Sequence, residues 1–226
     1  MIPLRDANPS RSFPAVTIAL IVVNTAAFFY ELKLGPALDH FILSYGFVPA
    51  VYFHQAHNEP WNFPTRFTPM ISSMFLHGGW MHLIGNMWTL WIFGDNVEDR
   101  LGRSRYLLYY LVCGVAACYF HYLTGPSSRI PVVGASGAIA GVMGGYFVLF
   151  PHARIVTLVP IFIFLQVMTL PAVLFLAFWF FIQLLNGMVA SSASFGGGVA
   201  WWAHVGGFVA GALMTLPNRR GRRYYY

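Results

Sequence analysis

Six stretches of this chain are apolar and long enough to cross a membrane as helices, and no other feature restricts the fold as much. A helix needs about 20 mostly apolar residues to span the hydrocarbon core of a bilayer. Of the 226 residues, 58% are hydrophobic and only 9% are charged, whereas a soluble domain carries about 25% charged residues. The stretches are 15–32, 78–94, 106–122, 135–150, 171–185 and 200–216. They predict an all-α polytopic membrane protein, a bundle of six transmembrane helices.

The six stretches also predict the domain organisation. Residues 1–14 form an N-terminal segment, residues 15–216 form the membrane domain, and residues 217–226 form a basic tail. No separate soluble domain fits in what remains. The first stretch is longer than the core of a typical signal peptide and no small-residue cleavage site clearly follows it, so we expect a membrane helix there. The boundary between the fourth and fifth stretches is open, because residues 155–167 are also apolar.

The basic residues predict the orientation of the bundle. With six spans, Lys33, Arg66 and Arg129 fall on one side and ten arginines fall on the other, which is the positive-inside pattern. The ten are Arg5, Arg11, Arg100, Arg103, Arg105, Arg154, Arg219, Arg220, Arg222 and Arg223. We therefore expect both termini in the cytoplasm and the protein in a plasma or inner membrane. The net charge of +6 then reflects topology and does not indicate nucleic-acid binding.

Two outer connections stand out. Residues 35–76 form a long loop rich in aromatic side chains, and loops of this length usually have a function or structure of their own. Apolar runs such as 41–43 favour a piece that lies in the membrane interface, with simple aromatic anchoring as the alternative. The connection 186–199 is rich in Gly, Ser and Ala and shows no sign of regular structure, which makes it a candidate gate.

Two of the apolar stretches carry small residues at every fourth position, a spacing that lets another helix backbone approach closely. These small residues are Gly137, Gly141 and Gly145 in one stretch and Ala203, Gly207 and Gly211 in the other. Ser136 directly precedes the first series, and His204 follows Ala203. If the two helices pack together, Ser136 and His204 meet near their outer ends. Polar side chains at membrane depth are costly and mark functional sites by default.

A serine within hydrogen-bond reach of a histidine is the minimum apparatus for nucleophilic acyl transfer. No acidic residue is next to His204 in the sequence, so a dyad is the economical interpretation. Acyl transfer also needs donors for the developing oxyanion. His82 and Asn86 are four residues apart and share a helix face, and the backbone N–H of Ser136, near a helix N-terminus, is free to join them. The alternative for His82 and Asn86 is ordinary hydrogen bonding between helices.

These residues resemble the motifs of the rhomboid intramembrane serine proteases. The matching runs are the segment 66–102, which holds His82 and Asn86, the Gly-Ala-Ser-Gly of 134–137 and the Ala-His-x-x-Gly-x-x-x-Gly of 203–211. The resemblance implies a six-helix fold whose first outer loop is embedded in the membrane, with 186–199 as the cap of the active site.

The resemblance also implies an activity and its residues. Ser136 would be the nucleophile, His204 the base, and His82 with Asn86 part of the oxyanion hole. The substrates would be transmembrane or membrane-adjacent proteins, cut near the outer face at small residues in locally unstable helices, without a cofactor.

The chain departs from the family pattern at two places. Some members carry a tyrosine that packs against the histidine, and Ala140 stands at that position. We expect Trp201 or Trp202 to support His204 instead. Thr65 and Arg66 replace a Trp-Arg pair, with Trp61 upstream. Neither departure removes a reactive group.

Other functions fit less well. A non-catalytic membrane protein that binds transmembrane clients would use the same glycines and aromatic loop, but it has no need of Ser136, His204, His82 and Asn86 together. A transporter would show an inverted repeat, and none is evident. We expect no metal, because the sequence lacks a His-Glu-x-x-His motif and neither carboxylate nor thiolate is placed to assist the histidines.

Overall fold

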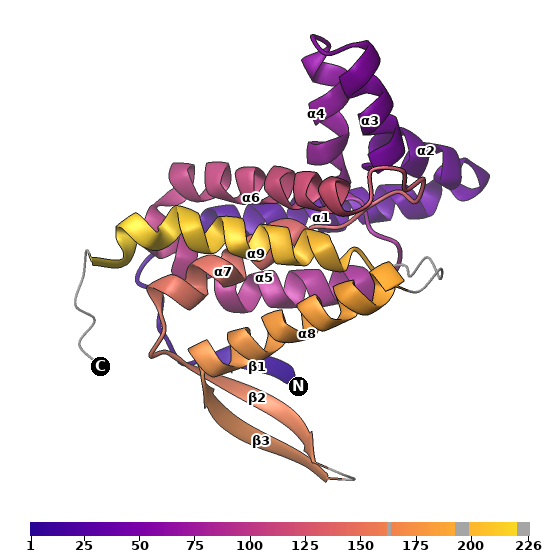
Figure 1. Cartoon of the computed structure of the whole chain (residues 1–226). Helices are drawn as coiled ribbons and strands as arrows, with labels where there is room; N and C mark the ends of the chain where they lie inside the picture. The colour runs from indigo at the N-terminus through magenta and orange to yellow at the C-terminus, as the bar shows by residue number, and fades with distance from the viewer. Residues whose placement is uncertain (162–163, 193–198, 221–226) are drawn as a thin grey trace.

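The computed structural model, described for residues 1–161, 164–192 and 199–220, is mostly helical (Figure 1). One long helix lies over each of the six apolar stretches. These helices are α1 (Ala15–Lys33), α5 (Trp80–Leu101), α6 (Arg103–Thr124), α7 (Ser136–Leu149), α8 (Ala172–Ser192) and α9 (Trp201–Thr215). Helix α7 occupies the centre, between α5, α6 and α9 (Figure 1), and its side chains are almost all buried.

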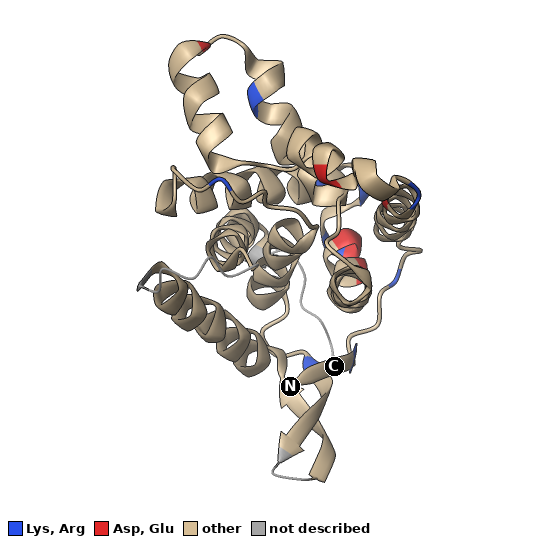
Figure 2. Ribbon diagram, turned by 90° about the vertical axis from the view of Figure 1, so that its right-hand side faces the viewer, with Lys and Arg blue, Asp and Glu red and all other residues tan. Residues whose placement is uncertain are grey.

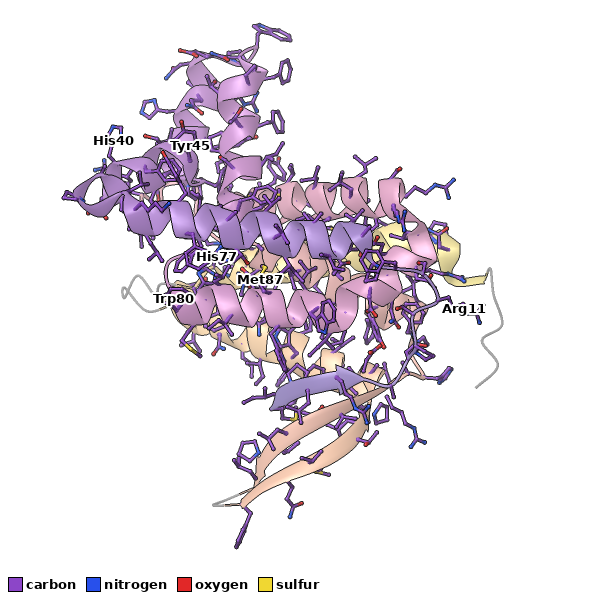
Figure 3. The ribbon with its side chains drawn as sticks, turned by 180° about the vertical axis from the view of Figure 1, so that it is seen from behind. Arg11, His40, Tyr45, His77, Trp80 and Met87 are labelled. Carbon is purple, nitrogen blue, oxygen red and sulfur yellow. The ribbon has the colours of Figure 1, made fainter. Side chains whose placement is uncertain are left out.

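Hydrogen bonds at the two ends of the bundle show that α1 and α5 run in opposite directions. At one end, the Ser12 hydroxyl, just before α1, donates to Asp99 in the last turn of α5 over 2.6 Å. At the other, the backbone N–H of His77, just before α5, donates to the Glu31 carboxylate near the end of α1. Figure 3 shows His77 at one end of the bundle and Arg11 at the other.

Three helices within the described ranges, α1, α6 and α8, are long and apolar enough to cross a bilayer by length and composition. The chain is therefore an integral membrane protein. Helix α5 has the length but carries polar residues, and α7 and α9 have only 14 and 15 residues. That all six helices cross the membrane stays a prediction.

The prediction of an all-α fold is wrong for residues 155–167. Strands β2 (Arg154–Ile161) and β3 (Phe164–Pro171) form an antiparallel hairpin there, and β1 (Ile2–Asp6) pairs antiparallel with β2 in the order β1-β2-β3. The physical reason lies in the composition of β2, which is rich in β-branched residues that favour strands and contains Pro160, which would break a helix. Strand β1 thus brings residues 2–6 of the N-terminal segment against the hairpin. The division of the chain at residues 14 and 216 stays a prediction.

The long connection 35–76 is helical throughout most of its length. It contains the 3₁₀ turn η1 (Gly35–Ala37), the helices α2 (Leu38–Tyr45), α3 (Pro49–Asn58) and α4 (Phe63–Ser72), and the turn η2 (Ser73–Phe75). Helices α3 and α4 project away from the long helices, upward in both views (Figures 1 and 2). The Arg66 guanidinium joins these two helices by donating to the Tyr52 hydroxyl over 3.2 Å. The connection 35–76 therefore has structure of its own, as expected. Its insertion into the membrane stays a prediction.

The expectation of an irregular connection at 186–199 is wrong for its first half, because α8 continues to Ser192. Gly187 allows the Trp202 ring to approach α8 closely, and the Trp202 indole N–H donates to the Ser191 hydroxyl over 2.9 Å. These contacts extend the helix beyond its apolar stretch. Residues 193–198 of the candidate gate lie outside the described residues, as do 221–226 of the basic tail, which follow the turn η3 (Leu216–Arg220).

Candidate active site

The small residues of α7 and α9 pack the two helices backbone to backbone. A Cβ atom on Gly207 would overlap the carbonyl of Gly137, and one on Gly211 would overlap the carbonyl of Gly141. Only glycine permits this approach, which lets the first turns of the two helices meet. The contact between α7 and α9 that the four-residue spacing of small residues predicts is therefore present.

Ser136 and His204 lie within hydrogen-bonding distance, with 2.9 Å between the serine Oγ and the histidine Nε2. Ser136 is the first residue of α7 and His204 is in the first turn of α9. Both side chains are half-buried. They line a cavity of about 1060 Å³ together with His82 and Asn86, so the four predicted polar residues share one space.

The other ring nitrogen of His204 contacts a residue that the sequence analysis missed. Its Nδ1 lies 2.8 Å from Oε1 of Gln183 on α8, while Nε2 of the same amide donates to the backbone carbonyl of Trp179 over 3.2 Å. Because that carbonyl can only accept, the Gln183 oxygen must face His204, and Nδ1 must carry the proton. The Nε2 atom of His204 is then the free acceptor that faces the Ser136 hydroxyl.

The rings around His204 differ in part from those expected. Trp201 lies edge-on to the imidazole of His204, with 6.1 Å between the ring centroids. Trp179 on α8 packs against the same imidazole with a tilted ring, and their centroids are 6.0 Å apart. Trp202 contacts Ser191 of α8 through its indole N–H. Ala140, where some family members have tyrosine, is fully buried. One sequence feature could have indicated Gln183, because it is the only amide side chain in the fifth apolar stretch, 171–185. Polar groups in such segments are functional by default.

His82 lies against the backbone just before Ser136. Gly134 has a φ of +119°, and a Cβ there would be 2.5 Å from Nε2 of His82, so this position requires glycine both for its conformation and for space. The backbone N–H of Gly78 donates to Nδ1 of His82 over 3.3 Å. In the neutral ring the proton is therefore on Nε2, the atom next to the chain that leads into Ser136.

Asn86 is held by a second histidine. Its side-chain amide lies 3.1 Å from Nε2 of His77, and both side chains are buried. Glu31 in turn holds the backbone of His77. The predicted pair of His82 and Asn86 therefore sits in a polar network that reaches from α1 to the cavity.

His121, at the end of α6, is a further cavity residue that the sequence analysis did not single out. Its Nδ1 atom is buried and has no hydrogen-bond partner among the described residues. Within the same part of the chain, no group of three His, Cys, Asp or Glu side chains is arranged to hold a metal ion.

Comparisons with known proteins identify the family that this chain resembles. A family model described as the Rhomboid domain matches residues 64–220. The chain is 34% identical over 100 residues to the presenilin-associated rhomboid-like protein A, mitochondrial, of Danio rerio. It is 37% identical over 94 residues to the rhomboid protein 1, mitochondrial, of Saccharomyces cerevisiae, and 30% identical over 136 residues to the putative rhomboid protease YdcA of Bacillus subtilis.

These alignments cover only parts of the proteins concerned. They include 43%, 40% and 60% of this chain, and 26%, 27% and 62% of the three relatives, in the same order. The chain thus spans about a quarter of the length of the two mitochondrial relatives and less than two thirds of the bacterial one.

Proposed function

The chain belongs to the rhomboid family, and we propose that it is an intramembrane serine endopeptidase that uses Ser136 as nucleophile and His204 as base. The observation that carries the proposal is the 2.9 Å contact between the serine Oγ and the histidine Nε2. A serine hydroxyl is a weak nucleophile until an adjacent base takes its proton, and Nε2 of His204 is the ring nitrogen that is free to do so.

The reaction follows from this geometry. Ser136 Oγ attacks the carbonyl carbon of the scissile peptide bond while its proton passes to Nε2 of His204. The tetrahedral intermediate collapses, the C–N bond breaks, and His204 returns the proton to the leaving amine. A water molecule then attacks the acyl-serine ester, giving its proton to His204, which passes a proton to Ser136 Oγ as the ester bond breaks.

The oxyanion of the intermediate requires donors that already point to its position. We assign this role to Nε2–H of His82, the side-chain amide of Asn86 and the backbone N–H of Ser136. The first two donors belong to α5. The third belongs to the start of α7, where the first backbone N–H groups have no acceptor within the helix. The contact between His82 and Gly134 supports this assignment.

Gln183 acts in the proposal as a positioning residue. It touches neither substrate nor the reacting atoms, but it fixes the proton of His204 on Nδ1 and orients the ring toward Ser136. In a serine hydrolase triad this work is done by a carboxylate. Here a neutral amide does it, which avoids placing a charge at membrane depth.

The membrane placement is part of the proposal. All six long helices cross the bilayer, both termini are cytoplasmic, and the connection 35–76 lies in the outer part of a plasma or inner membrane. The excess of arginine at the end where α1 begins supports this orientation. Substrates are then transmembrane or membrane-adjacent proteins, which reach Ser136 near the outer face, where water also enters the cavity.

A fluorophosphonate probe, which reacts with activated serines, tests the dyad in detergent-solubilised protein. We expect labelling of the parent protein and none of Ser136→Ala or His204→Ala. Ser127→Ala is the matched control, because Ser127 lines the same cavity but is not the serine bonded to His204. Parent-like labelling of Ser136→Ala would contradict the assignment.

Cleavage of a model transmembrane substrate reconstituted with the protein then tests the endopeptidase activity. The parent should release two fragments, and Ser136→Ala should release none while retaining the thermal unfolding profile of the parent. Substrate that is bound but left intact by the parent protein would favour a client-binding membrane protein.

A further inference from the structure

The hairpin 154–171, formed by β2 and β3, is anchored at its base and exposed at its far end. Ile155 and Thr157 in β2 are fully buried, and the backbone N–H of Ala172 donates to the carbonyl of Ala153 over 2.8 Å. In β3, by contrast, Phe164 is 66% exposed and Val167 is 63% exposed. The buried residues of β2 therefore fix the direction of the hairpin, while β3 presents apolar side chains to its surroundings, from Phe164 at the far end to Val167 halfway along.

The exposed surface of the hairpin continues the surface of α8. The sequence contains no Asp, Glu, Lys or Arg between Ile155 and Asn218. Large apolar side chains on α8 recur at a helical spacing and are also exposed; these are Leu174, Phe178, Phe181 and Leu185. An exposed apolar stripe on a membrane helix faces lipid. Because β3 leads into α8 without a break, the two surfaces adjoin each other.

The sheet also lies at the depth of the helices. In Figure 1 the long helices run from left to right, and the hairpin lies below them, between their left and right ends. In Figure 2 it projects downward, away from the helices. The side of a membrane bundle is the direction in which lipid is found. A hairpin built to lie in water would extend beyond the ends of the helices.

Two further features match the chemistry of the membrane interface. Arg5 and Arg154, both exposed, lie at the base of the sheet, where their guanidinium groups can reach lipid phosphates while the strands point inward. The outer edge of β3 has no partner strand among the described residues. Its free N–H and C=O groups would be costly in the hydrocarbon core, but interfacial water and lipid ester groups can satisfy them.

We propose that the hairpin 154–171 inserts into the interfacial layer of the lipid bilayer, on the side where α7 ends and α8 begins. Its apolar side chains contact the acyl chains. Arg154 at its base, together with Arg5 of the neighbouring β1, contacts the head groups. The occupant of this surface is lipid. The proposal is independent of the catalytic assignment, because it concerns residues outside the cavity of Ser136.

A fluorescent label attached to Val167→Cys tests the insertion. The unmodified parent is the background control, since Cys113 and Cys118 are buried. The protein is labelled with a nitrobenzoxadiazole maleimide and reconstituted into vesicles with or without phospholipids that carry a doxyl group near the ester. Leu174→Cys on α8 serves as the lipid-facing control and Ser12→Cys, before α1, as the aqueous control. An unchanged unfolding temperature shows that each variant folds.

We expect the label at Val167 to emit at shorter wavelength than at Ser12, to be quenched by the doxyl lipids as strongly as at Leu174, and to resist aqueous iodide. Iodide quenching equal to that at Ser12 would overturn the proposal, because the hairpin would then lie in water. Protection from both quenchers would overturn it as well, because a protein surface, such as a second copy of the chain, would then cover the hairpin.

Discussion

Gln183 on α8 and His204 on α9 share a hydrogen bond of 2.8 Å between the amide oxygen and Nδ1 of the imidazole. The backbone carbonyl of Trp179 binds the other end of the amide, so the amide cannot turn round without losing both contacts. This leaves His204 in the one neutral form that presents an acceptor to Ser136. The tautomer of His204, the proposed base, therefore depends on where α8 places Gln183.

Removing the amide should therefore slow the chemical step. For Gln183→Leu we expect kcat for a model transmembrane substrate to fall about 10- to 100-fold, as for a misoriented general base, with little change in KM. Gln183→Glu keeps an acceptor for the Nδ1 proton and should recover much of the loss. If both variants were equally impaired, or if KM changed instead of kcat, Gln183 would have only a structural role.

Gly134 provides a test of the oxyanion assignment. In Gly134→Ala the new Cβ would be 2.5 Å from Nε2 of His82 and would occupy a backbone conformation with φ of +119°, so His82 must move. We expect kcat to fall about 10²- to 10³-fold, the usual cost of one oxyanion donor. Gly125→Ala is the control, since its Cβ would meet nothing closer than 4.0 Å. Parent-like turnover by Gly134→Ala would contradict the role of His82.

The sequence predicted those parts of the site that depend on local spacing. The four-residue recurrence of small residues indicated the α7–α9 contact, and with it the meeting of Ser136 and His204. The motifs predicted the family, which the domain match confirms. Gln183 lies within the fifth apolar stretch, but its contact with His204 could not be predicted, because it depends on how α8 is rotated about its axis. That rotation is decided by packing against α9, not by local sequence.

The hairpin was missed for a different reason. In a membrane protein, a run of apolar residues serves equally well in a helix or in a strand, so hydropathy alone does not separate them. The signals that do separate them are the β-branched residues of 155–161 and the prolines at 160 and 171. The pairing of β2 with residues 2–6 is a contact between distant parts of the chain, which no local pattern indicates.

The close approach of α7 and α9 predicts a strong effect of small changes at Gly207. A methyl group in Gly207→Ala would overlap the carbonyl of Gly137, and overpacking of this kind costs about 1–3 kcal/mol. We expect a lower unfolding temperature in detergent and a lower rate of fluorophosphonate labelling, since Ser136 and His204 move apart. Gly85→Ala on α5, where a Cβ meets nothing within 4 Å, should unfold at or above the parent temperature. Equal stability of Gly207→Ala and the parent would exclude this packing.

Stability should also depend on pH through Asp6, outside the six long helices. Burial raises the pKa of its carboxyl to about 6, with a further contribution from the negative charge of Asp95, although the Tyr146 hydroxyl donates to it over 2.8 Å. The folded state therefore holds a proton that the unfolded state, with a pKa of 3.8, has lost, so stability falls as pH rises from about 4 to about 6. The free energy of unfolding should fall by about 1–2 kcal/mol over this range, because the carboxyl is partly exposed.

Asp6→Asn, which mimics the protonated form, should flatten this dependence on pH and raise the unfolding temperature at pH 7. Thermal unfolding of parent and variant between pH 4 and 7 decides the point: parallel curves would mean that Asp6 titrates alike in both states.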